Sequence, residues 1–175
     1  MTRLDKSLRL LGALMLCGIG IGVIWQQGTV RHDEASIAGS WFGTVLHGRV
    51  GSTRDIVTFG WSKGPLVGLK ITSECTVALL IGPLIILAAI MLAVTKMQIR
   101  RLAAGLAVAL AIVVVVNQLR LALIAVSTQH WGISGYDVSH KFVGTLVALV
   151  GFVAAVLLMI KLAAKPEPRG SHAAS

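Results

Sequence analysis

Long runs of apolar residues alternate with shorter polar segments along the chain. Four of these runs are long enough to cross a hydrocarbon core of ~30 Å as helices, because an α-helix rises ~1.5 Å per residue. Strands of a membrane barrel would be shorter and would alternate apolar with polar residues. The pattern therefore predicts an all-α membrane protein with four transmembrane helices, at residues 8–25, 76–94, 102–127 and 142–160.

The longest polar segment, residues 26–74, lies between the first two predicted helices and forms the predicted outer loop. Its second half holds two β-rich runs joined by a Gly-Pro turn, which predicts a β-hairpin that delivers the chain to Cys75. The last residues are polar and are expected to be disordered. We thus expect a single membrane domain over residues 1–164 and a cytoplasmic tail over residues 165–175.

Basic residues favour an orientation with both termini in the cytoplasm. The short loop between the second and third predicted helices holds Lys96, Arg100 and Arg101. The first apolar run follows basic residues, as a signal peptide would, but no small-residue cleavage site follows it, so we expect a retained anchor. The net charge of +9 then reflects topology and a match to anionic lipid head groups. The lipid bilayer is an expected partner, and nucleic acid is not.

Arg120 stands inside the third apolar run, where a charge costs roughly 2.5 to 3.5 kcal/mol even on the mildest scale. Such residues usually face a cavity, a partner or a substrate. In the expected topology, Cys75 and His140 open the second and fourth helices on the same outer side. Because the third helix runs outward, the Arg120 side chain leans toward the cytoplasmic end. Either this helix loosens after Arg120, or the site is sunk below the outer surface.

Three motifs resemble the exosortase and archaeosortase family. They are Cys75 after a β-rich outer segment, the run Asn117-Gln-Leu-Arg120 within a later helix, and His140 four residues before Gly144. The resemblance implies a membrane-embedded cysteine transpeptidase or protease that processes the C-terminal sorting signals of exported proteins. It also implies that Cys75 is the nucleophile, Arg120 the transition-state stabiliser and His140 the proton-transfer residue.

The same roles follow from the chemistry of these side chains. A free thiol is only slightly ionised near neutral pH, so a base or a nearby cation must help it to attack a carbonyl carbon. His140 is able to accept the proton, and Arg120 is suited to stabilise the oxyanion that develops. The product would be a thioester, which water, an amine or a glycan would resolve.

Other side chains have supporting or competing roles in this prediction. Asn117 lies one helical turn before Arg120 and is expected to orient it or to bond across helices. Asp137 or Glu74 would orient the imidazole of His140. His130, at the end of the third apolar run, is the alternative base. Cys17 has no such neighbours in the sequence and is expected to serve packing.

The alternative function is that of a non-catalytic four-helix subunit or a small transporter component. In that case Arg120 would bind an anion or a partner helix. The sequence contains no cluster of Cys, His and acidic residues with metal-ligand spacing and no nucleotide fingerprint. We therefore expect neither a metal nor a cofactor.

Overall fold

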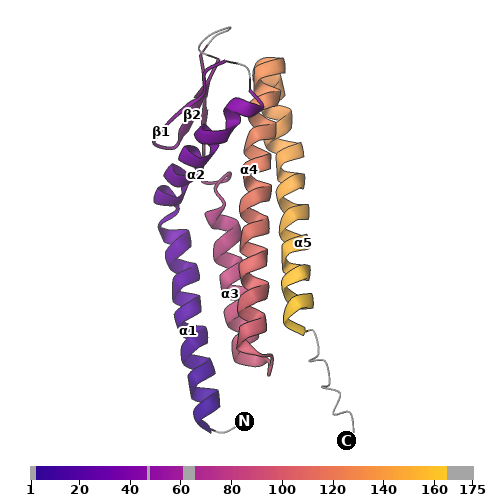
Figure 1. The fold of residues 1–175 in the computed structure, drawn as a ribbon. Coiled ribbons are helices and arrows are strands. Elements are labelled where there is room, and N and C mark those ends of the chain that lie inside the picture. The colour runs from indigo at the N-terminus through magenta and orange to yellow at the C-terminus, as the bar shows by residue number, and fades with distance from the viewer. Residues whose placement is uncertain (1–2, 47, 61–65, 165–175) are drawn as a thin grey trace, which may run out of the picture.

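The computed structural model describes residues 3–46, 48–60 and 66–164. Its long helices stand side by side in one bundle (Figure 1) and are α1 (Arg3–Trp25), α3 (Ala78–Val94), α4 (Ile99–Val138) and α5 (Gly144–Ala164). Helix α2 (Gln27–Trp41), the 3-10 helix η1 (Phe42–Thr44) and a small sheet gather at one end of this bundle. The start of α1 and the end of α5 lie at the opposite end.

Two helical segments of the described chain are long and apolar enough to cross a membrane, namely Asp5–Trp25 and Ile99–Ala164. The second of these joins α4 to α5 through the π-helix η2 (Ser139–Val143). Helix α3 is a shorter apolar helix of 17 residues. The mostly helical architecture agrees with the predicted class, while the number of membrane crossings stays a prediction.

Small residues bring α1 and α3 close together. A Cβ atom on Gly20 would stand 2.8 Å from Ile86 Cγ1 and 2.9 Å from the Gly82 carbonyl oxygen. A Cβ atom on Gly82 would in turn collide with the side chain of Ile24. Neither position leaves room for a side chain, so the two helices pack this closely only because both residues are glycine.

Helix α4 is longer than the predicted third helix, which ended at residue 127. The helix runs to Val138, and η2 carries the chain into α5. The prediction ended where the apolar run ends, but the helix continues beyond that run to a break at Gly132, and a second helical segment follows the break. The candidate base His140 stands on the helical backbone of η2, directly before α5.

The chain reverses direction within this long helical segment at Gly132. Its φ of 62° and ψ of −142° are not helical, and glycine reaches a positive φ without steric cost. After the turn, Gly135 packs directly against the Ser127 carbonyl of α4, where no side chain would fit. The returning segment is thus held against the helix that it has just left.

Helix α2 lies within residues 26–74, the segment that was predicted to be the outer loop, and no helix was predicted there. Its buried positions are Glu34, Ala35 and Ala38, so small and polar residues replace the large apolar stripe that normally signals a helix. Helix α2 packs on the sheet at Gly39, where a Cβ atom would stand 2.8 Å from Ser52 Cβ.

The predicted hairpin is confirmed by the pairing of β2 (Ile56–Phe59) with β3 (Val67–Lys70). The two strands are antiparallel, with Ile56 opposite Lys70 and Phe59 opposite Val67. The Gly-Pro turn that was expected to join them, and the tail of residues 165–175, lie outside the described residues. An additional strand, β1 (Gly51–Thr53), pairs with the other edge of β2.

Buried apolar side chains form two clusters in the described part of the chain. The sheet-side cluster lies between α2, the sheet and α4, and includes Phe42, Val57, Phe59, Ile71, Cys75, Leu121 and Ile124. The bundle cluster lies between the long helices and includes Leu84, Ala88, Leu102, Val113 and Met159, with Cys17 packed against it. Each cysteine of the chain therefore belongs to a different cluster.

Candidate active site

Cys75 lies in the segment between β3 and α3, sunk into the sheet-side end of the bundle. Its side chain is only 3% exposed. A turn ends at this residue, because the Cys75 N–H donates a hydrogen bond to the Thr72 carbonyl at 3.0 Å. Helix α3 begins only at Ala78. The sulfur is therefore positioned by the turn that precedes the helix.

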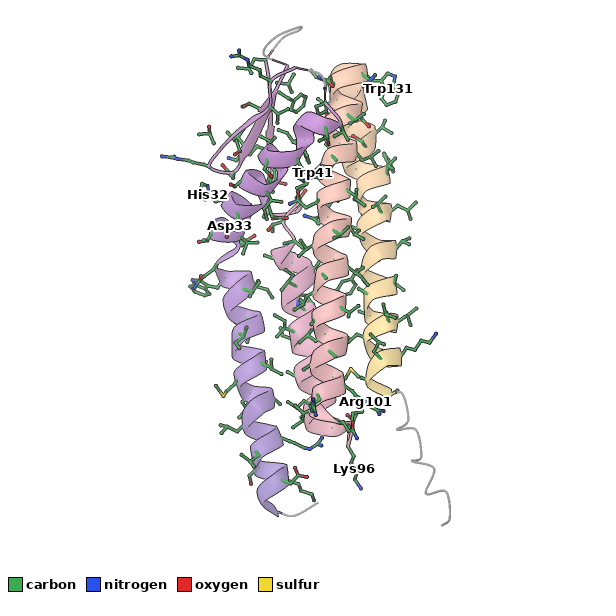
Figure 2. All side chains as sticks on the ribbon, viewed as in Figure 1. His32, Asp33, Trp41, Lys96, Arg101 and Trp131 are labelled. Carbon is green, nitrogen blue, oxygen red and sulfur yellow. The ribbon has the colours of Figure 1, made fainter. Side chains whose placement is uncertain are left out.

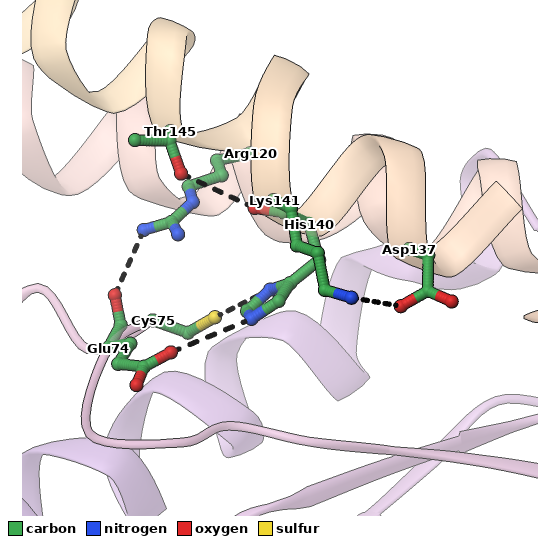
Figure 3. A network of polar contacts seen from close by, with 7 residues as sticks. All are labelled: Glu74, Cys75, Arg120, Asp137, His140, Lys141 and Thr145. Atoms are coloured by element: carbon green, nitrogen blue, oxygen red, sulfur yellow. Dashed lines mark hydrogen bonds and ion pairs between the residues drawn. The ribbon is translucent and has the colours of Figure 1, made fainter. Parts of the chain in front are cut away.

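His140 meets the sulfur from η2. The distance from Cys75 Sγ to His140 Nδ1 is 3.3 Å (Figure 3). The imidazole stacks on Tyr136, with ring centroids 5.1 Å apart and ring planes only 9° from parallel. Its Nε2 atom lies 4.0 Å from a carboxylate oxygen of Glu74. That carboxylate favours a proton on Nε2, which leaves Nδ1 free to accept the thiol proton.

Arg120 comes from α4 and is 6% exposed. Its guanidinium extends toward the Cys75 segment, and Nη1 donates a hydrogen bond to the Glu74 carbonyl oxygen at 3.3 Å (Figure 3). The buried Nε–H has no hydrogen-bond acceptor. Among the described residues, no carboxylate lies within ion-pair distance of Arg120. Its charge is therefore not neutralised by a direct partner.

The depth of the Cys75 segment explains how Arg120 reaches it. Helix α4 stays regular after Arg120 and continues to the turn at Gly132, which is about 18 Å further along its axis. The Cys75 segment descends beside α4 to the level of Arg120. Of the two alternatives, a loosened helix or a sunken site, the structure shows the sunken site.

Gly144 makes room for the arginine. A Cβ atom at this position would stand 3.1 Å from Arg120 Nε, 3.3 Å from Arg120 Cγ and 2.7 Å from the Ser139 carbonyl oxygen. The absent side chain lets the arginine stem lie against the start of α5. The spacing of His140 and Gly144 thus places the imidazole and the space for the guanidinium on consecutive helical turns.

Asn117 fixes the backbone of Cys75. Its side-chain amide donates hydrogen bonds to the Cys75 carbonyl oxygen at 2.9 Å and to Glu34 Oε1 at 2.6 Å. The expectation that Asn117 bonds across helices is therefore confirmed, because these partners lie outside α4. Asn117 is fully buried, so both bonds are shielded from water.

Glu34 is part of the site, although sequence reasoning missed it. The residue lies in α2, is 4% exposed, and accepts hydrogen bonds from Thr76 Oγ1 at 2.7 Å and from the Val77 N–H at 3.0 Å. The spacing of Glu34, Ala35 and Ala38 places them on one helical face, but two alanines carry too little hydrophobic signal to predict that this face is buried.

Two of the predicted supporting residues differ in their relation to His140. Glu74 approaches the imidazole with a carboxylate that is 82% exposed. Asp137 instead pairs with Lys141, at 3.0 Å and one turn along the same helical segment. The alternative base His130 is exposed, and its Nδ1 bonds to the Val126 carbonyl of its own helix at 3.0 Å. The structure brings Cys75, Arg120, His140 and Glu74 together, and it places His130 near the tip of α4.

Burial raises the pKa of the Cys75 thiol above its ordinary value. The positive charge of Arg120 lowers this pKa, and the carboxylates of Glu74 and Glu34 raise it further. Burial also lowers the pKa of the His140 imidazole, so both directions favour a neutral thiol beside a neutral imidazole. Ionisation of the sulfur then depends on proton transfer to Nδ1, with Arg120 stabilising the negative charge.

A cleft of about 600 Å³ opens beside the Cys75 thiol, onto residues that surround it. Its polar end is lined by Glu74, Arg120, His140 and Lys141, and its apolar end by Leu80, Ala148, Leu149 and Phe152. Leu80 belongs to α3, and the other three apolar residues belong to α5. The cleft therefore lies between these two helices, next to Arg120 of α4. A second cavity of about 500 Å³ is lined by apolar and small residues near the Gly132 turn, away from the Cys75 thiol.

The fold and the site define a helical membrane protein with a buried cysteine, a histidine in contact with its sulfur and an arginine beside them. The family model of the transmembrane exosortases matches residues 63–159, which is more than half of the chain. The chain therefore belongs to the exosortase family, a family of membrane transpeptidases and proteases. The matched range contains Cys75, Arg120 and His140 but not Glu34. No curated protein and no solved structure matches the chain.

Proposed function

We propose that this protein is a membrane-embedded cysteine transpeptidase or protease that cleaves the C-terminal sorting signal of exported, membrane-anchored proteins. The observation that carries the proposal is the 3.3 Å contact between Cys75 Sγ and His140 Nδ1, because the His140 imidazole lines the polar end of the cleft together with Arg120. A nucleophile and a base within hydrogen-bond reach are the minimum that covalent catalysis needs.

The reaction begins when the Cys75 thiol gives its proton to His140 Nδ1 and Sγ attacks the substrate carbonyl carbon. The tetrahedral intermediate collapses as the C–N bond breaks, and His140 returns the proton to the leaving amine. A thioester then joins the substrate to Sγ. Water completes a proteolysis, whereas an amine or a glycan hydroxyl completes a transfer.

Arg120 stabilises the oxyanion in this scheme. The guanidinium is buried, carries no direct ion pair in the described chain and keeps an unused donor at Nε. Preorganised donors of this kind contribute roughly 10²- to 10³-fold to the rate of acyl transfer. The bond from Nη1 to the Glu74 carbonyl holds the guanidinium beside the thiol before substrate arrives.

The shape of the cleft supports a substrate that enters sideways from the lipid. A membrane helix of the substrate would lie along the apolar end, against Leu80, Leu149 and Phe152. The peptide next to that helix would then reach Arg120 and His140 at the polar end. This arrangement suits a cleavage site that directly adjoins a membrane anchor.

The proposed topology has four membrane crossings, both termini in the cytoplasm and the site facing the outer side of a prokaryotic inner membrane. Lys96 and Arg101 lie at the end of the bundle opposite the sheet, and Trp131 lies at the sheet-side end (Figure 2). This orientation predicts basic residues at the cytoplasmic end of the bundle and aromatic residues at the membrane interface of its outer end. The proposed single domain covers residues 1–164.

The test compares the C-terminal ends of membrane-anchored exported proteins in cells that produce the parent protein, Cys75→Ala, Arg120→Ala or His140→Ala. Mass spectrometry of their C-terminal peptides should show processed ends with the parent protein and none with Cys75→Ala. Membrane levels of each variant serve as the folding control. Processing that persists in Cys75→Ala but stops in Arg120→Ala would instead support the non-catalytic role in which Arg120 binds a partner.

A further inference from the structure

Glu34 is a buried carboxylate that accepts several hydrogen bonds and has no ion-pair partner among the described residues. Its Oε1 accepts hydrogen bonds from the Val77 N–H at 3.0 Å and from Asn117 Nδ2 at 2.6 Å, and its Oε2 accepts from Thr76 Oγ1 at 2.7 Å. Burial raises the pKa of this carboxyl group, and the hydrogen bonds from Thr76, Val77 and Asn117 oppose that increase by favouring the ionised form, which is an acceptor only. Charge-assisted bonds of this kind are about twice as strong as neutral ones.

These bonds join three separate parts of the chain. Glu34 belongs to α2, Asn117 to α4, and Thr76 and Val77 directly precede α3. The Val77 N–H is among those that the start of α3 leaves without a carbonyl partner, and a carboxylate there also complements the helix dipole. Glu34 thus caps α3 from another helix.

Cys75 lies inside this arrangement. Its carbonyl oxygen accepts a bond from the same Asn117 amide that donates to Glu34, and the next two residues are bound to the Glu34 carboxylate. The backbone is therefore held on the C-terminal side of Cys75, and the Thr72 turn holds it on the N-terminal side. Both restraints together hold the Cys75 backbone in the position from which the sulfur contacts His140.

We propose that Glu34 is a positioning residue that aligns the Cys75 sulfur with His140 by clamping the first residues of α3 to Asn117. The inference rests on the proposed role of Cys75 as the nucleophile. It assigns part of the active site to the N-terminal region, outside the range that the family model matches. Glu34 itself touches neither the sulfur nor the cleft lining.

Helix α2 is anchored for this task by its neighbours. Gln118 Nε2 donates to the Glu34 carbonyl oxygen at 3.4 Å, and Trp41 Nε1 donates to Gln118 Oε1 at 3.2 Å. Both bonds connect α2 to the same residue of α4, which directly follows Asn117. A displacement of α2 would therefore move the carboxylate and the residues that it holds.

The experiment uses full-length protein in membranes with Cys17→Ala, so that Cys75 is the single thiol of the chain. Glu34→Gln removes the charge and keeps the size, and the exposed neighbour Asp33→Asn is the matched control. Two quantities are measured, namely the processing of membrane-anchored exported proteins and the pH midpoint for alkylation of Cys75 by N-ethylmaleimide. The charged or titratable groups around the sulfur are Arg120 of α4, His140 of η2, Glu74 of the Cys75 segment, Tyr136 and Glu34.

We expect Glu34→Gln to slow processing by roughly a hundredfold, the effect of a misplaced reacting group. We also expect it to shift the alkylation midpoint to lower pH, because the negative charge of Glu34 raises the pKa of the thiol. Burial is the largest cause of the raised pKa, so the maximal alkylation rate is compared as well, and an unchanged rate shows that the sulfur has not become more exposed. If Glu34→Gln matches Asp33→Asn in both measurements, the proposal is wrong.

A second variant covers the possibility that Glu34→Gln does not accumulate. Thr76→Val removes one donor to the carboxylate and keeps the size of the side chain. It should slow processing several-fold, and unchanged processing would overturn the proposal. Cys75→Ala is measured in parallel. If that variant still processes substrate, the proposed function fails, and the alkylation midpoint alone then decides whether Glu34 acts on Cys75.

Discussion

The two cysteines of this chain lie in two different clusters of buried apolar residues, and they differ in the polar groups around them. Cys17, in α1, packs half-buried against the bundle cluster, and no hydrogen bond of its sulfur occurs in the described chain. Cys75 is buried in the sheet-side cluster and contacts His140, with Asn117 on its carbonyl oxygen. Burial alone therefore does not distinguish a packing thiol from a candidate nucleophile.

The difference lies in how many elements contribute polar side chains. Side chains of three elements lie around Cys75, namely Glu34 of α2, Asn117 and Arg120 of α4, and His140 of η2. Each buried polar group costs free energy unless it is paired, so their concentration in one place requires a compensating function. The bundle cluster, with no comparable set, is explained by packing.

Loss of the base should give the largest effect of the substitutions that probe this contrast. His140→Ala removes the proton acceptor 3.3 Å from the sulfur, and we expect processing to fall by roughly 10²- to 10⁴-fold. The control is His130→Ala, which changes an exposed histidine near the tip of α4 and should leave processing unchanged. Quantitative mass spectrometry of substrate C-termini measures both. The reverse order of effects would make His130 the base.

Arg120→Ala should slow processing by roughly 10²- to 10³-fold, because the oxyanion loses its positive charge. Arg120→Lys keeps the charge but loses the planar donors, and we expect an intermediate rate. The measurement is the processing rate at equal membrane levels. A lysine variant that is as slow as the alanine variant would show that geometry, and not charge, is the contribution of this residue.

Gly144→Ala should impair the site through the arginine. The added methyl group would stand 3.1 Å from Arg120 Nε and 2.7 Å from the Ser139 carbonyl, so the guanidinium or α5 must move. We expect processing to fall about tenfold, which corresponds to ~1.4 kcal/mol of transition-state stabilisation. Gly22→Ala is the matched control, since nothing lies within 4 Å of a Cβ atom there. Equal rates for both variants would contradict the proposed contact.

The smallest expected effect is a shift in the pH dependence of thiol alkylation. Burial raises the pKa of Cys75, so its alkylation should reach half its maximal rate at a higher pH than that of an ordinary thiol. Arg120 opposes this increase, and Arg120→Ala should therefore move the midpoint further upward. N-ethylmaleimide labelling in the Cys17→Ala background measures the midpoint. A downward shift would show that Arg120 does not act on the sulfur.

The apolar runs were sufficient to locate the four long helices, because burial in lipid or in a bundle demands continuous apolar surface. The hairpin of β2 and β3 was also predictable from its β-rich runs. Helix α2 was not, since its buried face consists of Glu34, Ala35 and Ala38, and small residues carry little hydrophobic signal. The length of α4 was missed because hydropathy marks apolar surface and not the end of a helical backbone.

The residues proposed to carry out the chemistry could be predicted from the sequence, but the residue that holds their backbone in place could not. Cys75, Arg120 and His140 were selected by residue type and by their shared side of the predicted bundle, and the structure brings them together. Their catalytic roles stay predictions. Glu34 could not be selected in this way, because its partners lie 42 to 83 residues away in the sequence and are joined to it only by the fold.

The central claim, that Cys75 forms a thioester with the substrate, is tested most directly by trapping that intermediate. Membranes that process substrate are quenched in acid, and peptides containing Cys75 are analysed by mass spectrometry before and after neutral hydroxylamine. The account predicts a substrate peptide joined to Cys75 that hydroxylamine releases, with no such adduct on Cys17. Continued processing by a Cys75→Ala protein, with no thioester in the parent protein, would contradict it.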